Sequence, residues 1–219
     1  MPIPDINYAS RPLNPERMEA LLRYAGRSIL DVGCGSGVYV LALKGRFDIY
    51  GMDHHRYEEW QKAPELFQIA TGEKLPFTDN SFDTVVSFET LEHLKEPLLA
   101  LKEYHRVCRK NVILSVPNCD VTKGMLKSNL VFSHWLDRTH VHYFDKNSIA
   151  SLMTQAGFSI FRNEAINRIS LAPLVAEKMG MAPEGIVARA LRKTSTFSPF
   201  RRYYLTRLVV AEKYGVLSA

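Results

Sequence analysis

The chain has 219 residues, 46% of them hydrophobic, which is enough for one sizeable core and too few for two full domains. Its formal net charge of +5 permits acidic substrates, but aromatic and basic residues are not interleaved as in an RNA-binding module, so nucleic acid is a disfavoured partner. The three cysteines lack C-x-x-C spacing, which argues against a disulfide framework or a cysteine zinc site and fits a reducing compartment. Because we find neither a signal-peptide pattern nor a stretch of membrane-spanning length, we expect a cytoplasmic protein.

The first predicted element is a helix near the N-terminus. Residues 1–13 contain three prolines and are expected to form an irregular arm. Asn14 followed by Pro15 is typical of a helix N-cap and first turn, and Gly26 marks the expected end of this helix.

Residues 28–38, S-I-L-D-V-G-C-G-S-G-V, predict a short apolar strand that runs into a glycine turn and then into a helix over 38–44. Only glycine lets a backbone turn so sharply and also approach a ligand closely. The amides at the start of the helix would point at whatever lies over the turn, which suits a dinucleotide, a nucleoside or a carboxylate.

The spacing of the glycines argues against two of the usual ligands. A dinucleotide fingerprint needs a third glycine at position 38, which is Val38, and no Gly-Lys-Ser/Thr triplet follows as in a phosphate-binding loop. Asp31 enters the turn, and its carboxylate disfavours a pyrophosphate and favours a cation or a hydrogen-bond donor. The alternative is a tight turn that binds no ligand.

The second predicted strand, residues 47–53, ends on a carboxylate. Asp53 lies 20 positions beyond Gly33, where a charged acceptor can take hydrogen bonds from the two hydroxyls of a ribose. The alternative role for Asp53 is to cap a helix over residues 55–61.

Strands and helices continue to alternate along the chain, which predicts an open, largely parallel sheet. Further strands are expected at 65–70, 84–88, 111–116, 158–162 and 203–212, and further helices at 97–109 and at 148–155, the latter capped by Asp145. His93 follows the fourth strand and is either a catalyst or, more often at such a place, a packed or capping residue.

Residues 119–144 fit neither a clean helix nor a clean strand, and this segment leaves the end of a strand where it can cover a ligand crevice. His140 or His142 can take the proton of an attacking hydroxyl, because imidazole titrates near neutrality. The alternative is a histidine that only ties the segment to the sheet. A metal site is disfavoured, because H-x-H points the two rings to opposite faces of an extended chain, and no metal is expected.

Several motifs arrive in the order found in one enzyme family. The glycine turn, L-P-F-T-D-N-S-F-D-T-V-V-S, L-E-H, D-R-T-H-V-H-Y-F and L-M-T-Q-A-G-F together resemble the class I S-adenosylmethionine-dependent methyltransferases over residues 28–165. The resemblance implies a doubly wound α/β fold with a mostly parallel seven-stranded sheet, an antiparallel last strand and a cap over the carboxyl ends of the strands. It also implies one domain over residues 1–219, with 119–144 and 166–200 as cover segments on the substrate side.

The resemblance further implies S-adenosyl-L-methionine as the cofactor. Thr71 stands where many members carry an aspartate, so adenine recognition is expected from the Thr71 hydroxyl or from the backbone beside it. The residues expected to hold the cofactor are Asp31, Gly33, Cys34, Gly35, Gly37, Asp53, His54, Thr71, Gly72, Glu73, Leu75, Phe88 and Glu89.

The expected reaction is methyl transfer by in-line displacement to a small-molecule acceptor, with a hydroxyl oxygen as the preferred atom and His140 and His142 as catalytic candidates. The acceptor is expected to be anionic or sugar-like. The C-terminal third is basic through Arg189, Arg192, Lys193, Arg201 and Arg202, which indicates a solvated face or, less often, a site for an anionic substrate or membrane surface. The alternatives are a non-catalytic S-adenosylmethionine-binding regulatory protein and a nucleotide-dependent oxidoreductase.

Overall fold

The computed structural model describes residues 13–129, 133–170, 176–182, 184–187, 189–190 and 203–214. The expected N-terminal arm, apart from Leu13, lies outside these residues, as do all the basic side chains of the C-terminal third named above except Arg189. The cap expected over 166–200 is described only in part. Within the described residues, none of the helices combines the length and the apolar character needed to cross a membrane.

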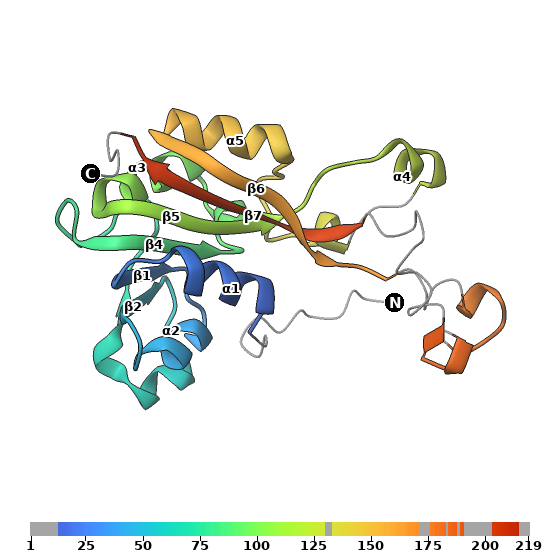
Figure 1. Cartoon of the computed structure of the whole chain (residues 1–219), viewed down its shortest axis with the longest axis horizontal. Helices are drawn as coiled ribbons and strands as arrows, with labels where there is room; N and C mark the ends of the chain where they lie inside the picture. The colour runs from blue at the N-terminus through green and yellow to red at the C-terminus, as the bar shows by residue number, and fades with distance from the viewer. Residues whose placement is uncertain are drawn as a thin grey trace.

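Seven strands form one sheet in the order β3-β2-β1-β4-β5-β7-β6 (Figure 1). Their bounds are β1 Ser28–Val32, β2 Asp48–Asp53, β3 Phe67–Ile69, β4 Phe82–Phe88, β5 Cys108–Pro117, β6 Phe158–Arg168 and β7 Tyr204–Lys213. The first five strands pair in parallel, and β7 runs antiparallel to both β5 and β6. The predicted mostly parallel sheet with an antiparallel last strand is therefore confirmed.

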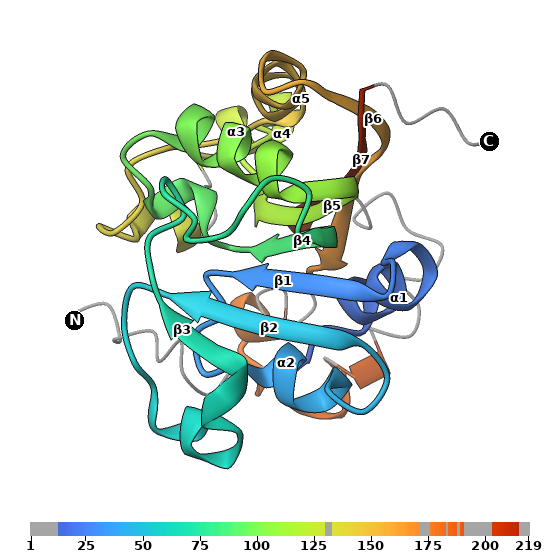
Figure 2. The ribbon, with the colours of Figure 1, turned by 90° about the vertical axis from the view of Figure 1, so that its left-hand side faces the viewer.

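Helices cover both faces of this sheet. The described helices include α1 Pro15–Tyr24, α2 Val38–Leu43, α3 Pro97–Val107, α4 Lys123–Ser128 and α5 Lys146–Gln155, and the short 3-10 helices η2 Glu58–Lys62, η3 Pro64–Leu66, η4 Leu91–His93 and η5 Ser133–Leu136. The faces are covered by α1 and α2 on one side and by α3 and α5 on the other. Apolar side chains of α1 and α2 share one buried cluster with the sheet, and those of α3 and α5 share another. Figure 2 shows β5, β4, β1 and β2 following one another across the sheet.

The alternation of side chains along β1 decides which face each residue serves. Ile29 packs in the cluster of α1 and α2, whereas Leu30 packs in the cluster of α3 and α5. Because successive side chains of a strand point to opposite faces, Asp31 shares the face of Ile29 and lies toward α1 and α2. This alternation places the Asp31 carboxylate on the face of the sheet that α1 covers.

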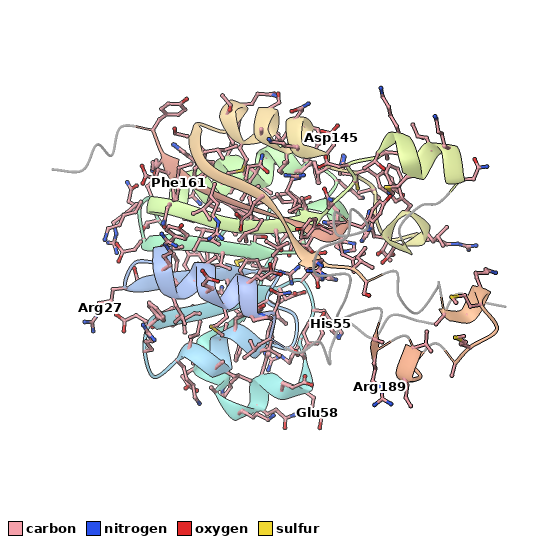
Figure 3. The ribbon with its side chains drawn as sticks, turned by 45° about the vertical axis from the view of Figure 1, so that its right-hand side comes forward. Arg27, His55, Glu58, Asp145, Phe161 and Arg189 are labelled. Carbon is pink, nitrogen blue, oxygen red and sulfur yellow. The ribbon has the colours of Figure 1, made fainter. Side chains whose placement is uncertain are left out.

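The helix starts follow the predicted caps. The Asn14 side chain accepts hydrogen bonds from the backbone N–H groups of Glu16 and Arg17, both at 3.0 Å. Asp145 caps α5 in a reciprocal capping box with Ser148 (Figure 3). β6 is longer than predicted and continues to Arg168, because β7 pairs with it as far as Tyr204. Pairing with β7 thus extends β6 beyond Arg162, the charged residue at which the sequence pattern predicted its end.

The carboxyl ends of the parallel strands define the functional edge of the sheet. In Figure 3, Arg27, before β1, lies at the left, and His55, after β2, lies near the middle of the molecule, on the side toward which the parallel strands run. Figure 1 shows α4 and the helical turns within residues 176–190 beyond the edge toward which β5 points. Ligands of such sheets bind in the crevice outside the carboxyl ends of the strands, so a binding site is expected at this edge.

Candidate active site

The turn between β1 and α2 has a backbone that only glycine adopts readily. Gly33, Gly35 and Gly37 have φ angles of +75°, +54° and +78°. A Cβ added at Gly33 would lie 2.2 Å from Thr90 Oγ1, and one added at Gly37 would lie 2.4 Å from the Phe67 ring. A Cβ at Gly35 meets nothing within 4 Å. The outer two glycines are therefore needed by protein packing, and the middle one borders open space.

The turn is held against β2 by hydrogen bonds on both sides. The N–H groups of Gly33 and Cys34 donate to the Met52 carbonyl at 2.8 and 3.0 Å. The Gly35 N–H donates to Asp53 Oδ2 at 2.9 Å, and the Gly35 carbonyl accepts from Trp60 Nε1 at 2.9 Å. The shape of the turn is thus fixed before any ligand arrives.

Trp60 lies in an aromatic layer below the turn. Its indole stacks on Phe67 with ring centroids 4.9 Å apart and an interplanar angle of 8°. Together with Tyr57, the two rings line a cavity of about 260 Å³ between η2 and η3. Phe67 also fills the space over Gly37, so the stack supports the turn from β3.

Asp53 ends β2 beside this turn. Its Oδ1 accepts from the His55 N–H at 3.2 Å and lies 2.8 Å from His54 Nδ1, while the His54 side chain is exposed. The alternative role as a helix cap for 55–61 is wrong, because only the 3-10 helix η2 forms there and its N-cap is Tyr57. Asp53 instead faces the glycine turn.

Asp31 is a buried carboxylate one strand away. Asp31 is 2% exposed. Burial raises the pKa of Asp31 to about 7; the negative charge of Asp53 adds to this rise, and the positive charge of Arg17 opposes it. Burial also raises the pKa of the neighbouring Cys34 thiol, so that thiol stays protonated and inert. An added cation here would favour ionised Asp31.

Helix α1 contributes a charge that the sequence patterns did not indicate. Arg17 Nη2 lies 2.5 Å from Glu89 Oε1, and its guanidinium sits 5.3 Å from the centre of the Phe88 ring. Glu89 also accepts from Ser115 Oγ at 3.1 Å and has a φ of +53°, an unusual backbone for a residue with a side chain. Phe88 and Glu89, two of the residues expected to hold the cofactor, are thus both contacted by Arg17.

The loop after β3 carries the residues expected near adenine. Thr71 and Lys74 form an isolated bridge, and Gly72 is buried close to the Tyr104 hydroxyl. Leu75 lies in the core, and its backbone N–H donates to Glu103 Oε2 at 2.9 Å. Arg106 donates to the Leu75 and Phe77 carbonyls, so α3 holds this loop in place.

The cover segment, residues 119–144, begins and ends at one point, where the Cys119 N–H donates to the Phe144 carbonyl at 3.1 Å. Buried Arg207 of β7 fastens its start by hydrogen bonds to Asn118 and Asp120. The N–H groups of Val141 and His142 both donate to the Glu92 carbonyl, which fastens its far end to η4. The segment is therefore anchored on both sides.

The two histidines proposed as catalysts have different surroundings. The His140 side chain is 6% exposed; its Nδ1 lies 3.0 Å from the His134 carbonyl, and its ring centroid is 4.8 Å from that of His93. The His142 Nε2 lies 3.2 Å from the Lys95 carbonyl at an exposed position. His93 lies on η4, its Nδ1 is 3.1 Å from the Thr139 carbonyl, and burial lowers its pKa.

The structure gathers the predicted residues unevenly. The glycine turn, Asp31, Asp53, Phe88 and Glu89 lie at adjoining strand ends, as parallel pairing of β1 with β2 and β4 requires. Arg17 and Trp60 were missed by sequence reasoning. The only sequence signal for Arg17 was its position in the first turn of a capped helix. The only signal for Trp60 was the presence of a tryptophan in a polar loop.

Comparison with known proteins agrees with this geometry. The family model described as "Methyltransferase domain" matches residues 30–116. The chain is similar to an O-methyltransferase of Pyrenophora dematioidea, 26% identical over 206 residues that cover 87% of this chain and 76% of that protein.

The following two proteins are among those whose solved structures share the fold. A putative methyltransferase from Bacillus halodurans C-125 superposes with a TM-score of 0.63 at 17% identity, covering 90% of this chain and 97% of that one. Magnesium protoporphyrin IX methyltransferase from Synechocystis PCC 6803, whose structure has bound SAH (S-adenosylhomocysteine), superposes with a TM-score of 0.56 at 18% identity, covering 90% and 80%.

Proposed function

Because the chain belongs to the class I S-adenosylmethionine-dependent methyltransferases, we propose that it transfers the methyl group of S-adenosylmethionine to a hydroxyl oxygen of a small molecule. The description of the Pyrenophora relative as an O-methyltransferase supports oxygen as the acceptor atom. The observation that carries the proposal is the open space beside Gly35, bordered by the carboxylate of Asp53.

The residues of the turn fit such a cofactor. A cofactor without phosphate but with a ribose, an ammonium and a sulfonium needs hydrogen-bond acceptors and negative charge. Asp53 would accept from the ribose hydroxyls, and buried Asp31 with Glu89 would favour the cationic methionine end. The backbone of residues 71–73 would meet the adenine.

When bound, the cofactor supplies a methyl group that its positive sulfur has already activated. The remaining work of the chain is to hold the acceptor oxygen in line with that methyl group and to exclude water. The anchored cover segment suits this role, because it is fastened to β7 at one end and to η4 at the other.

His140 is the better placed of the two candidate proton acceptors. With Nδ1–H donating to the His134 carbonyl, the neutral ring keeps its lone pair on Nε2, where an acceptor hydroxyl can deliver its proton. Asp137 Oδ2 lies 3.6 Å from this Nε2 and would stabilise the protonated ring. His142 is expected to contribute less, since its Nε2 faces a backbone carbonyl.

Thermal unfolding with and without ligands tests the cofactor assignment. S-adenosylhomocysteine should raise the melting temperature and NAD should not; the reverse result would favour the oxidoreductase. Methyl transfer is then measured with labelled cofactor and a panel of hydroxylated small molecules that includes sugars and carboxylic acids.

His140→Ala separates catalysis from binding. This variant should lose turnover while its affinity for S-adenosylhomocysteine is retained, with His142→Ala as the matched control. Tight cofactor binding without methyl transfer to any of these molecules or to any lysate fraction would favour a non-catalytic regulatory protein.

A further inference from the structure

Two imidazoles and a buried carboxylate converge between η4 and the cover segment. Glu92 is 1% exposed, and its Oε1 lies 3.9 Å from His93 Nε2. The candidate ligand atoms of Glu92, His93 and His140 all lie within 4.8 Å of one another. Glu92 and His93 come from the turn after β4 and His140 from a segment 47 positions after His93, so tertiary folding alone brings them together.

The Nδ1 atoms of His93 and His140 each face a backbone carbonyl. His93 Nδ1 lies 3.1 Å from the Thr139 carbonyl, and His140 Nδ1 lies 3.0 Å from the His134 carbonyl. A carbonyl only accepts, so each Nδ1 carries the proton, and the lone pair of each neutral ring is on Nε2. Metal-binding histidines are oriented in this way, with the other ring nitrogen donating to a carbonyl or carboxylate.

A second carboxylate stands beside this group. Asp137 Oδ2 lies 3.6 Å from His140 Nε2, and the Asp137 side chain is only 8% exposed. Its Oδ1 accepts from the N–H and the hydroxyl of Thr139 at 2.9 and 2.6 Å. The same short loop therefore orients Asp137 and, through the Thr139 carbonyl, His93.

We propose that Glu92, His93 and His140 bind a divalent transition metal of the zinc class, with Asp137 available as a further ligand. Imidazole nitrogen with carboxylate oxygen suits zinc, and the hard cations magnesium and calcium prefer oxygen alone. Bond lengths of about 2.0–2.1 Å place tetrahedral ligand atoms roughly 3.3 Å apart. Binding of the ion would therefore have to draw these ligand atoms together from their present separations of up to 4.8 Å.

Such an ion would join the cover segment to the end of β4. It would take the Nε2 lone pair of His140, so the proton-accepting role proposed for His140 applies to the metal-free protein. Two histidines and a glutamate leave the fourth position of a tetrahedral zinc ion for water or an oxygen ligand, as in catalytic rather than structural zinc sites. The sequence alone disfavoured a metal because it compared His140 with His142, whereas the structure pairs His140 with His93 on another element.

Metal binding is tested on the full-length protein without an affinity tag, stripped with EDTA. Equilibrium dialysis against zinc, with metal measured by mass spectrometry, should give one bound equivalent at micromolar free zinc. His140→Ala and His93→Ala should each weaken binding at least tenfold. His142→Ala, two positions away on the same segment, is the matched control and should bind like the wild type.

Cobalt supplies a readout on the wild type alone, which keeps the inference testable if a variant does not fold. Bound cobalt should show the visible bands of a nitrogen and oxygen site without a thiolate charge-transfer band. The inference is overturned by absence of zinc binding to the wild type, by a thiolate band, or by equal losses in His140→Ala and His142→Ala. None of these results bears on cofactor binding at the glycine turn, which is measured separately.

Discussion

Replacing Asp31 by asparagine should stabilise the ligand-free protein at neutral and alkaline pH while weakening its binding of a cationic cofactor. Asp31 is 2% exposed, and burial, with the charge of Asp53 added, raises its pKa from 3.8 to about 7. The ionised side chain is therefore a cost to the folded state unless a cation lies nearby. Asparagine has nearly the same shape and carries no charge.

The size of the effect follows from the two pKa values. One pKa unit corresponds to about 1.36 kcal/mol, so ionised Asp31 lowers the free energy of unfolding by up to about 4 kcal/mol at pH 8. Between about pH 4 and about pH 7 the folded state keeps a proton that the unfolded chain has lost, so stability falls as pH rises through this window. At pH 5.5 the cost is about 2 kcal/mol.

Urea unfolding of wild type and Asp31→Asn at pH 5.5, 7 and 8 measures this cost. The stability advantage of the variant should grow by about 2 kcal/mol from pH 5.5 to pH 8. Asp83→Asn is a control of opposite sign: burial acts to raise the pKa of Asp83, but the Ser28 N–H, Lys110 and Arg109 lower it overall. Parallel pH profiles for wild type and Asp31→Asn would refute the reasoning.

Three further substitutions address the glycine turn and its support. Gly35→Ala should lose only about 1–2 kcal/mol of unfolding free energy, which is the cost of a side chain at positive φ. It should nevertheless bind S-adenosylhomocysteine at least tenfold more weakly, because the new methyl group enters the open space. Gly33→Ala should lose more stability, since its Cβ would meet Thr90, and equal urea midpoints for these two variants would contradict this difference. Trp60→Phe keeps an aromatic ring against Phe67 but removes the hydrogen bond to the Gly35 carbonyl. Urea unfolding should therefore show a loss of about 1 kcal/mol in unfolding free energy. An unchanged midpoint would show that this hydrogen bond is dispensable.

Local patterns predicted the fold well because its elements are locally encoded. Asn14 and Pro15 start a helix by satisfying or omitting backbone donors, and three glycines at alternate positions impose a turn whatever surrounds them. Asp53 was placed correctly beside that turn, because parallel strands end at one edge of a sheet.

The partners of the site residues depend on contacts that no local pattern encodes. Arg17 reaches Glu89 across 72 positions, and His140 meets His93 across 47. The sequence pattern D-R-T-H-V-H allowed only His140 and His142 to be compared with each other, but in the fold these two histidines have different partners. Alternation along a strand does fix that Asp31 faces α1, but only packing decides that it becomes buried there.

Calorimetric titration with S-adenosylhomocysteine, on wild type and on Asp53→Ala, tests the central claim most directly. The wild type should bind one molecule, and the variant should bind more weakly by about 1–3 kcal/mol through lost charge-assisted hydrogen bonds to the ribose. Equal affinities for the two proteins, or no binding to the wild type, would contradict the assignment of the glycine turn and Asp53 as the cofactor site.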